Sequence, residues 1–534
     1  MMRGAPSQHV SGTRTMVNFR RRIGVVAVLI TLAGSQAHAA DPVANPKLTA
    51  RIDDLLEQQW QADGIEPTRP TSDAEFLRRV SLDLTGVTPT VSAVRDFLAD
   101  TDPAKRSKLI DRLLDSRRHA VHFARIWREV MLPSSTNEQF RLGAAAPFER
   151  WLEQQFVDNR PYDETVRELL VTTGQVNAVG PALFYQAVQF KPEELAASTS
   201  RTFLGVQIQC AQCHDHPFDQ WTQKDFWGFA AHFAQLRRPD DVAQFRGLVV
   251  DTGTGEVMLP DTDVVVQPRL LDGRHLDEAL TAGTRREQLA RWLASADNPW
   301  FARATVNRVW ALLFGRGFVD PVDDFGQHNA PSHPDLLDLL ARDFADHDFD
   351  MRRLLRVLTR TRAYQLSSEV TYDAARRRHA FAAMSVKSLS ADQIYDCLQR
   401  VTGNRLLSSG PPSSSDVAAR RAFLAKFDAP TQQVTEFQGG IPQALAMLNG
   451  QVVADASHWE KSDLLVAVTD SPFFSNAERL EILFLAALSR MPTDDERNRF
   501  EEYIAVPGGE FEASRRLADV LWALINSSEF ILNH

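Results

Sequence analysis

The feature that most constrains the fold is a helical spacing of apolar residues that recurs along most of the chain. Apolar side chains follow one another at three- and four-residue intervals, beginning with residues 52–56. Helix-start signals separate these stretches: Thr90 as an N-cap, Asp102–Pro103 as a cap followed by a first-turn proline, Pro192 as another first-turn proline, and a capping box at Thr493–Glu496. The sequence therefore predicts a mainly α protein built from many helices.

The helical period is interrupted once, between about residues 245 and 273. Short valine-rich runs alternate there with Asp-, Thr- and Gly-containing turns, which is typical of short strands. A chain of 534 residues is long enough for several domains. We therefore expect a helical domain over residues 40–240, a short β insert or linker over 241–280, and a second helical domain over 281–534. The serine-rich segment 408–415 is expected to be a surface loop.

The N-terminus has the three parts of a secretory signal. Arg20–Arg22 is a basic region, residues 23–33 are an apolar run, and Ala37–Ala39 is a small-residue cleavage site. Residues 1–39 are therefore predicted to be a signal peptide and the mature protein to be periplasmic or extracellular; the alternative is an uncleaved anchor. Because no later stretch reaches membrane-spanning length, we expect no transmembrane segment in the mature chain.

Charge and cysteine content exclude two classes of protein. A net charge of −10 argues against a nucleic-acid-binding protein, which would carry a basic face. The three cysteines, Cys210, Cys213 and Cys397, are too few for a disulfide framework, so the core must be held by burial. Cys397 is expected to be a small buried residue on a helix.

The strongest chemical signal is the sequence Cys-Ala-Gln-Cys-His at residues 210–214. Two thiols separated by two residues can each bond to a haem vinyl group, and the adjacent histidine can ligate the iron. Cys210, Cys213 and His214 are therefore predicted to hold a covalent haem c, with His214 as the metal ligand. The predicted export agrees with this, since such haem is attached outside the cytoplasm.

Two other interpretations of the motif stay open. Cys210 and Cys213 with His214 or His216 would suit zinc or another divalent metal, although no second ligand pair follows at a recognisable spacing. Alternatively, the two cysteines would form a structural or redox disulfide.

Further polar and aromatic residues follow the motif directly. Asp215, His216, Asp219 and Trp221 are expected to surround the cofactor or a bound substrate. His216 is too close in sequence to His214 to reach the opposite face of a haem easily. The sixth iron ligand is therefore expected to come from elsewhere or to be missing. The candidates are His232, Met258, Met384, Met447 and several other histidines.

A second polar cluster comprises Asn307, Arg308, Asp323, Asp324 and His333. The two aspartates and the histidine would bind a metal or perform acid–base chemistry. The structural interpretation is that these residues are helix caps, turns and buried ion pairs. The sequence leaves open whether this cluster meets the cysteine motif in space; if it does, one composite site becomes the better hypothesis.

The motifs together resemble a known family. The segments that carry the resemblance are residues 78–86, 203–206, 210–234, 307–310, 314–317, 323–326, 332–334 and 442–449. They resemble the planctomycete cytochrome-like proteins, which combine domains of unknown function 1549 and 1553. The resemblance covers nearly all of the mature chain, without the N-terminal cytochrome c domain that many relatives carry.

The resemblance implies a haem protein but brings no established activity. We predict an exported protein with one c-type haem and a redox role, either electron transfer or an oxidoreductase reaction, with an unidentified redox partner or extracellular substrate. The lack of a second haem argues against a simple electron relay. Two alternatives remain: a non-haem metal-dependent enzyme, such as a hydrolase of extracellular polysaccharide because similar genes are associated with that function, and a structural or binding protein.

Overall fold

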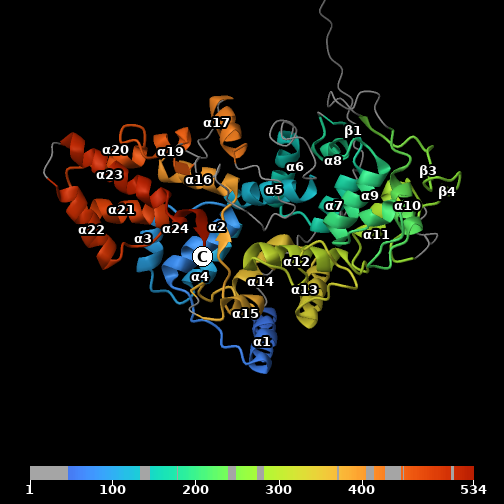
Figure 1. Ribbon diagram of the computed structural model, residues 1–534, viewed down its shortest axis with the longest axis horizontal. Coiled ribbons are helices and arrows are strands. Elements are labelled where there is room, and N and C mark those ends of the chain that lie inside the picture. Colours follow the sequence, from blue (N-terminus) through green and yellow to red (C-terminus); the bar gives the residue numbers. More distant parts are fainter. Residues whose placement is uncertain are drawn as a thin grey trace, which may run out of the picture. The chain divides into compact units, whose positions relative to one another are not determined.

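The computed structural model describes residues 46–132, 145–176, 178–237, 248–273, 282–369, 372–403, 414–426, 447–448, 450–506 and 510–534. The predicted signal peptide lies outside these residues, as do most of the serine-rich loop and the outer parts of the expected β insert. The described chain is mainly helical with small two-stranded sheets, which confirms the predicted fold class (Figure 1).

Within the described residues, ten α-helices precede the β insert. They are α1 (Pro46–Asp63), α2 (Asp73–Thr85), α3 (Val91–Ala99), α4 (Lys105–Leu114), α5 (Arg117–Met131), α6 (Ala146–Val157), α7 (Tyr162–Val171), α8 (Leu183–Ala187), α9 (Pro192–Thr199) and α10 (Gln223–Ala230). Short helical turns lie among them: η2 (Gly180–Ala182), the π-helix η3 (Ser200–Leu204), η4 (Gln209–Gln212) and η5 (Ala231–Phe233).

Helices also dominate the rest of the chain. They are α11 (Arg285–Leu293), α12 (Phe301–Phe314), α13 (Pro334–Asp346), α14 (Met351–Thr359), α15 (Ala374–His379), α16 (Ala391–Val401), α17 (Ser414–Leu424), α19 (Gln451–Ala456), α20 (Asp463–Thr469), α21 (Asn476–Leu488), α22 (Asp494–Ala505), α23 (Glu510–Ile525) and α24 (Ser528–Ile531). In Figure 1 the helices α21, α22 and α23 lie side by side, and they contact one another.

Three of the described strands lie where the change of period predicts them, and three lie elsewhere in the chain. The strands are β1 (Gly174–Gln175), β2 (Leu248–Val249), β3 (Val257–Met258), β4 (Val265–Val266), β5 (Lys387–Ser388) and β6 (Leu532–Asn533). β3 and β4 form a hairpin within the insert, whereas β2 pairs antiparallel with β1, between α7 and α8. The insert is thus tied back to the preceding helices.

The helix-start signals were mostly accurate. The Thr90 side chain caps α3, Pro192 opens α9, and Thr493 with Glu496 forms the capping box of α22. The prediction at Asp102–Pro103 was wrong by two residues, because Asp102 accepts a hydrogen bond from the Ala104 N–H within a turn and α4 begins after it.

The described residues form two hydrophobic cores that share helices. The larger core gathers apolar side chains between residues 48 and 384 together with Leu485 of α21, and the smaller one gathers those of α16 and the later helices together with Leu82 and Val87. Helix α2 contributes to both: Phe76 and Val80 belong to the larger core and Leu82 to the smaller. Because the larger core includes helices on both sides of the insert, it does not divide there; the domain limits at 241–280 stay a prediction.

Helix α2 is anchored through its buried arginines. Arg78 donates hydrogen bonds to the backbone carbonyls of Ala487 and Phe530, at 3.0 and 2.9 Å. Arg79 donates to the carbonyls of Tyr364 and Leu366, at 2.7 and 2.8 Å. Each guanidinium carries several donors in a fixed fork, so one side chain satisfies two carbonyls at once. Both arginines thereby join α2 to residues hundreds of positions later.

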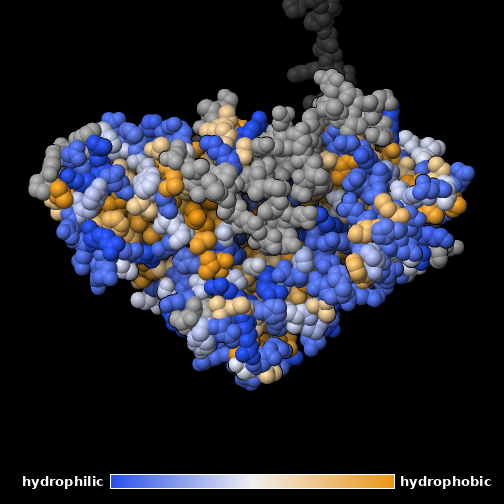
Figure 2. Space-filling view, in the orientation of Figure 1, coloured by the Kyte–Doolittle hydropathy of each residue, from blue (hydrophilic) through white to orange (hydrophobic). Residues whose placement is uncertain are grey.

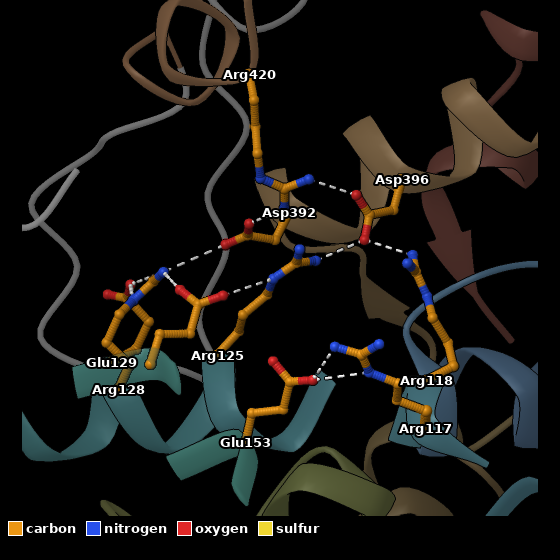
Figure 3. Close-up of polar contacts among 10 residues, drawn as sticks. Arg117, Arg118, Arg125, Arg128, Glu129, Glu153, Asp392, Asp396 and Arg420 are labelled. Atoms are coloured by element: carbon orange, nitrogen blue, oxygen red, sulfur yellow. Dashed lines mark hydrogen bonds and ion pairs between the residues drawn. The ribbon is translucent and has the colours of Figure 1, made fainter. Parts of the chain in front are cut away.

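A second charged network joins α5 to α16 and α17 (Figure 3). Asp396, which is 3% exposed, accepts from Arg118 and Arg125 of α5 and from Arg420 of α17. Asp392, one turn earlier on α16, also accepts from Arg420. These arginines hold the pKa values of both aspartates below their usual range, despite the opposing effect of burial. Both carboxylates are therefore ionised, and their ion pairs link α16 to α5 and α17.

The described surface is largely polar. On the face shown in Figure 2, hydrophilic residues predominate, with hydrophobic residues visible among the C-terminal helices. Of the helices in the described ranges, none has the length and apolar character required to cross a membrane.

Candidate functional site

The cysteine motif lies in a loop between η3 and α10. Helix α9 runs directly into the π-helix η3, which ends at Gly205 with φ +67°. A side chain would be strained at this φ, and an added Cβ would lie 2.7 Å from Phe325 Cδ2. Gly205 therefore permits both the reversal of the chain and its close packing on a distant loop. π-Helical turns of this kind often occur at functional sites.

Both cysteines of the motif are accessible thiols. Cys210 lies in η4 and Cys213 directly follows it, while Ala211 between them is fully buried and fixes the turn to the core. Within the described residues all the cysteines are free, and Cys397 is buried on α16 as expected. The turn thus presents two thiols to solvent.

His214 has a defined hydrogen bond at one ring nitrogen. Its Nδ1 lies 2.8 Å from the Asp215 carbonyl oxygen. A carbonyl only accepts, so Nδ1 carries the hydrogen and the neutral ring has its lone pair on Nε2. The ring is also exposed to solvent. This is the tautomer that binds a metal through Nε2, with a backbone carbonyl fixing the orientation of the ring.

The first turns of α10 hold the motif in place. Gln223 donates from its backbone N–H to Asp215 Oδ1 at 2.8 Å and from Nε2 to the Cys213 carbonyl at 2.9 Å. Trp227 Nε1 donates to the Gln212 carbonyl at 3.0 Å. Reasoning from the sequence missed these tethering roles. Their spacing of four residues, just after a Thr222 capping box, is the signal that places both on one face of a helix.

The other residues expected around the cofactor shape the loop. His216 donates its backbone N–H to the Trp221 carbonyl at 2.8 Å, which closes the loop. The Trp221 ring is buried and packs near Trp300. Asp219 Oδ1 accepts the Gln220 N–H at 2.7 Å. Asp215, His216, Asp219 and Trp221 are therefore parts of one folded loop beside the motif.

Two residues of the second cluster are buried and connect neighbouring segments through hydrogen bonds. Asn307 of α12 donates to the Val319 carbonyl at 2.8 Å and accepts from the Val319 N–H at 3.0 Å. Arg308 donates to the Thr202 carbonyl at 2.7 Å, which connects α12 to η3. The structure thus gives Asn307 and Arg308 contacts that position the loops around the motif.

The two aspartates of the cluster have different partners. Asp323 forms an ion pair with Arg201 of η3 at 3.2 Å. Asp324 Oδ2 lies 3.1 Å from Nε2 of His328, a histidine that the sequence alone did not single out. His333 packs instead against the rings of Phe318 and Phe381, where burial lowers its pKa to about 4.

The cysteine loop and the second cluster meet in space. The Phe325 N–H donates to the Gly205 carbonyl at 2.8 Å, and Gln327 Nε2 donates to Gln220 Oε1 at 3.3 Å. A Cβ added at Gly326 would lie 2.7 Å from Asp219 Oδ2, so these two loops are in direct contact. The structure thus brings residues 323–328 against the cysteine loop, and we refer to these two loops together as the composite site.

Two family models match the two segments of the chain that contain these contacting loops. Residues 51–238 match the family described as PSCyt2, a protein of unknown function (DUF1549), and residues 285–419 match PSD1, a protein of unknown function (DUF1553). The chain belongs to the planctomycete cytochrome-like family. No curated protein and no solved structure gives a significant match. In this family member the cysteine loop lies in the first matched segment, and the Asp324–His328 loop lies in the second.

As placed in the described residues, the side chains that could ligate a metal do not form a preformed metal site. Across the described ranges, no group of three or more His, Cys, Asp or Glu side chains is placed to hold a metal ion. Of the residues considered for a sixth iron ligand, His232 and Met384 are buried in the larger core region, Met447 belongs to the smaller core, and Met258 is exposed on β3.

Proposed function

We propose that the mature protein is an exported c-type haem protein with a redox role. Cys210 and Cys213 would form the thioether bonds and His214 would ligate the iron through Nε2. The observation that carries this proposal is the His214 Nδ1 contact with the Asp215 carbonyl, which leaves the Nε2 lone pair available beside two exposed thiols. Bound haem would supply one-electron iron chemistry.

The surroundings of the motif hold it in one conformation at the surface. Phe218, five residues after Cys213, is 78% exposed on the same loop. Gln223 and Trp227 hold the backbone carbonyls of Cys213 and Gln212, so the thiols and imidazole are presented on a fixed turn.

The test is a pyridine haemochrome spectrum of the mature protein, co-expressed with a cytochrome c maturation system. We expect haem that survives denaturation and acid–acetone extraction. C210A and C213A should each retain one thioether and show a shifted haemochrome band, and the double variant should release all haem. C397A is the matched control, because it removes the remaining cysteine from a buried helix and should leave haem attachment unchanged.

Absence of covalent haem under these conditions would reject the proposal. Metal analysis of the same preparation then decides the next hypothesis. Stoichiometric zinc that is lost in C210A and C213A would support the metal-dependent enzyme. A preparation without haem or metal, in which the two thiols form a disulfide, would support the structural role.

A further inference from the structure

The composite site contains a histidine–aspartate pair that neither the motif nor the family description assigns. His328 Nε2 lies 3.1 Å from Asp324 Oδ2, and the imidazole side chain is 43% exposed. Asn329 Nδ2 donates to the Asp324 carbonyl at 3.1 Å, which fixes the backbone that carries this carboxylate. The carboxylate can only accept, so Nε2 carries the hydrogen in the neutral ring. Nδ1 therefore has a lone pair that can receive a proton.

A second carboxylate faces the same imidazole from the cysteine loop. A Cβ placed on Gly326 would lie 2.7 Å from Asp219 Oδ2, 2.7 Å from His328 Nδ1 and 2.6 Å from His328 Cε1. Asp219 and the Nδ1 edge of His328 thus approach the same point from two segments of the chain. Both groups therefore pack closely against the Gly326 backbone, where there is no room for a side chain.

The charges around this point select the kind of molecule that it can accept. Asp219 and Asp324 border the imidazole, and the nearby Asp323 is paired with Arg201. This arrangement leaves an excess of negative charge, which disfavours an anionic substrate. A neutral molecule with a hydroxyl group, or water, can instead donate a hydrogen bond to Nδ1 or to Asp219.

We infer that Asp324 and His328 form a general-base pair which, with Asp219, makes a proton-transfer site for a neutral hydroxyl compound or water. The O–H bond breaks, its proton bonds to His328 Nδ1, and the electron pair remains on the oxygen. Asp324 stabilises the imidazolium that results, and Asp219 orients the hydroxyl group. The inference does not depend on the haem attachment proposed above.

The test uses p-nitrophenyl acetate, a small neutral ester, as a probe of base strength in the full-length protein. A positioned base speeds such reactions by orders of magnitude, so we expect H328Q to lower the catalysed rate at least about tenfold. The matched control is H347Q. His347 also has an aspartate four residues before it, at 3.4 Å, and a similar exposure of 45%, but it lies at the end of α13.

Two further variants separate catalysis from folding. D324N should lower the catalysed rate, because the imidazolium that forms loses the carboxylate that stabilises it. G326A should lower the rate without removing any charged group, since the new Cβ separates Asp219 from His328. Circular dichroism should be unchanged in both. Equal rates for wild type and H328Q, or equal losses in H328Q and H347Q, would overturn the inference whether or not haem is attached.

Discussion

Replacement of Asp396 by asparagine should destabilise the protein strongly, although the two side chains have nearly the same shape. Asp396 Oδ2 lies 2.5 Å from Arg118 and 2.6 Å from Arg125, and Arg420 bonds its other oxygen. The substitution removes one buried negative charge from three guanidinium groups. Breaking one partner of a buried ion pair typically costs about 3–5 kcal/mol, because a charge remains without compensation.

The connections of each arginine refine this magnitude. Arg125 also pairs with Glu149, and Arg420 also pairs with Asp392, so both keep a carboxylate in the variant. Arg118, by contrast, forms one ion pair among the described residues, and its partner is Asp396. We therefore expect a loss of about 3 kcal/mol, which is the cost of one buried unpaired guanidinium and not of three.

The assay is urea unfolding followed by circular dichroism, with Glu153→Gln as the control (Figure 3). Glu153 pairs with Arg117 at 2.9 Å in the same region, but Arg117 is 72% exposed. Exposed pairs contribute about 0–1 kcal/mol, so the control should have nearly the wild-type midpoint. The reasoning is refuted if Asp396→Asn loses less than about 1 kcal/mol, or if both variants lose equal amounts.

Three further outcomes are expected. Burial lowers the pKa of His119 to about 4 and of His122 to about 3, below the unfolded value of about 6.5. The unfolded state therefore binds more protons than the folded state below pH 6.5. As the pH is lowered, the free energy of unfolding should fall by up to about 1.4 kcal/mol per pH unit for each histidine. Urea titrations at pH values from about 7 to 4.5 measure this fall. Gly205→Ala should lower the melting temperature, since φ is +67° and the added methyl has no room; an unchanged melting temperature would contradict this. Asn533→Ala removes a 2.7 Å hydrogen bond to the buried Asp83 carboxylate and should cost about 1–3 kcal/mol in the same urea assay, whereas a loss of a few tenths would contradict it.

Local signals in the sequence predicted much of the fold. Caps and first-turn prolines act over three or four residues, so the starts of α3, α9 and α22 follow from the chain itself. The start of α4 did not, because Asp102 can satisfy a turn as readily as a helix N-terminus. The pairing of β2 with β1 also escaped prediction, since it joins strands more than 70 residues apart.

The candidate site shows the same division. The thiols and His214 are adjacent in sequence, so the chain itself makes their chemistry evident. The approach of Asp219 and His328 to Gly326 was not evident, because two loops about a hundred residues apart meet only through tertiary packing. His333 attracted attention as a candidate ligand, whereas His328, five residues earlier, has the aspartate partner. Spacing in sequence does not distinguish a histidine that packs against phenylalanines from one that faces a carboxylate.

The arginine anchors of α2 affect when the molecule can finish folding during its synthesis. Arg78 lies 452 residues before Phe530, whose carbonyl it binds. At typical ribosomal rates of about 5–20 residues per second, roughly 20 to 90 s pass between the emergence of these two residues. During that interval Arg78 lacks the Phe530 carbonyl that it binds, so the burial of this guanidinium must wait. Such a delay suits the proposed export, because a nascent chain that stays open can still cross a membrane before it closes.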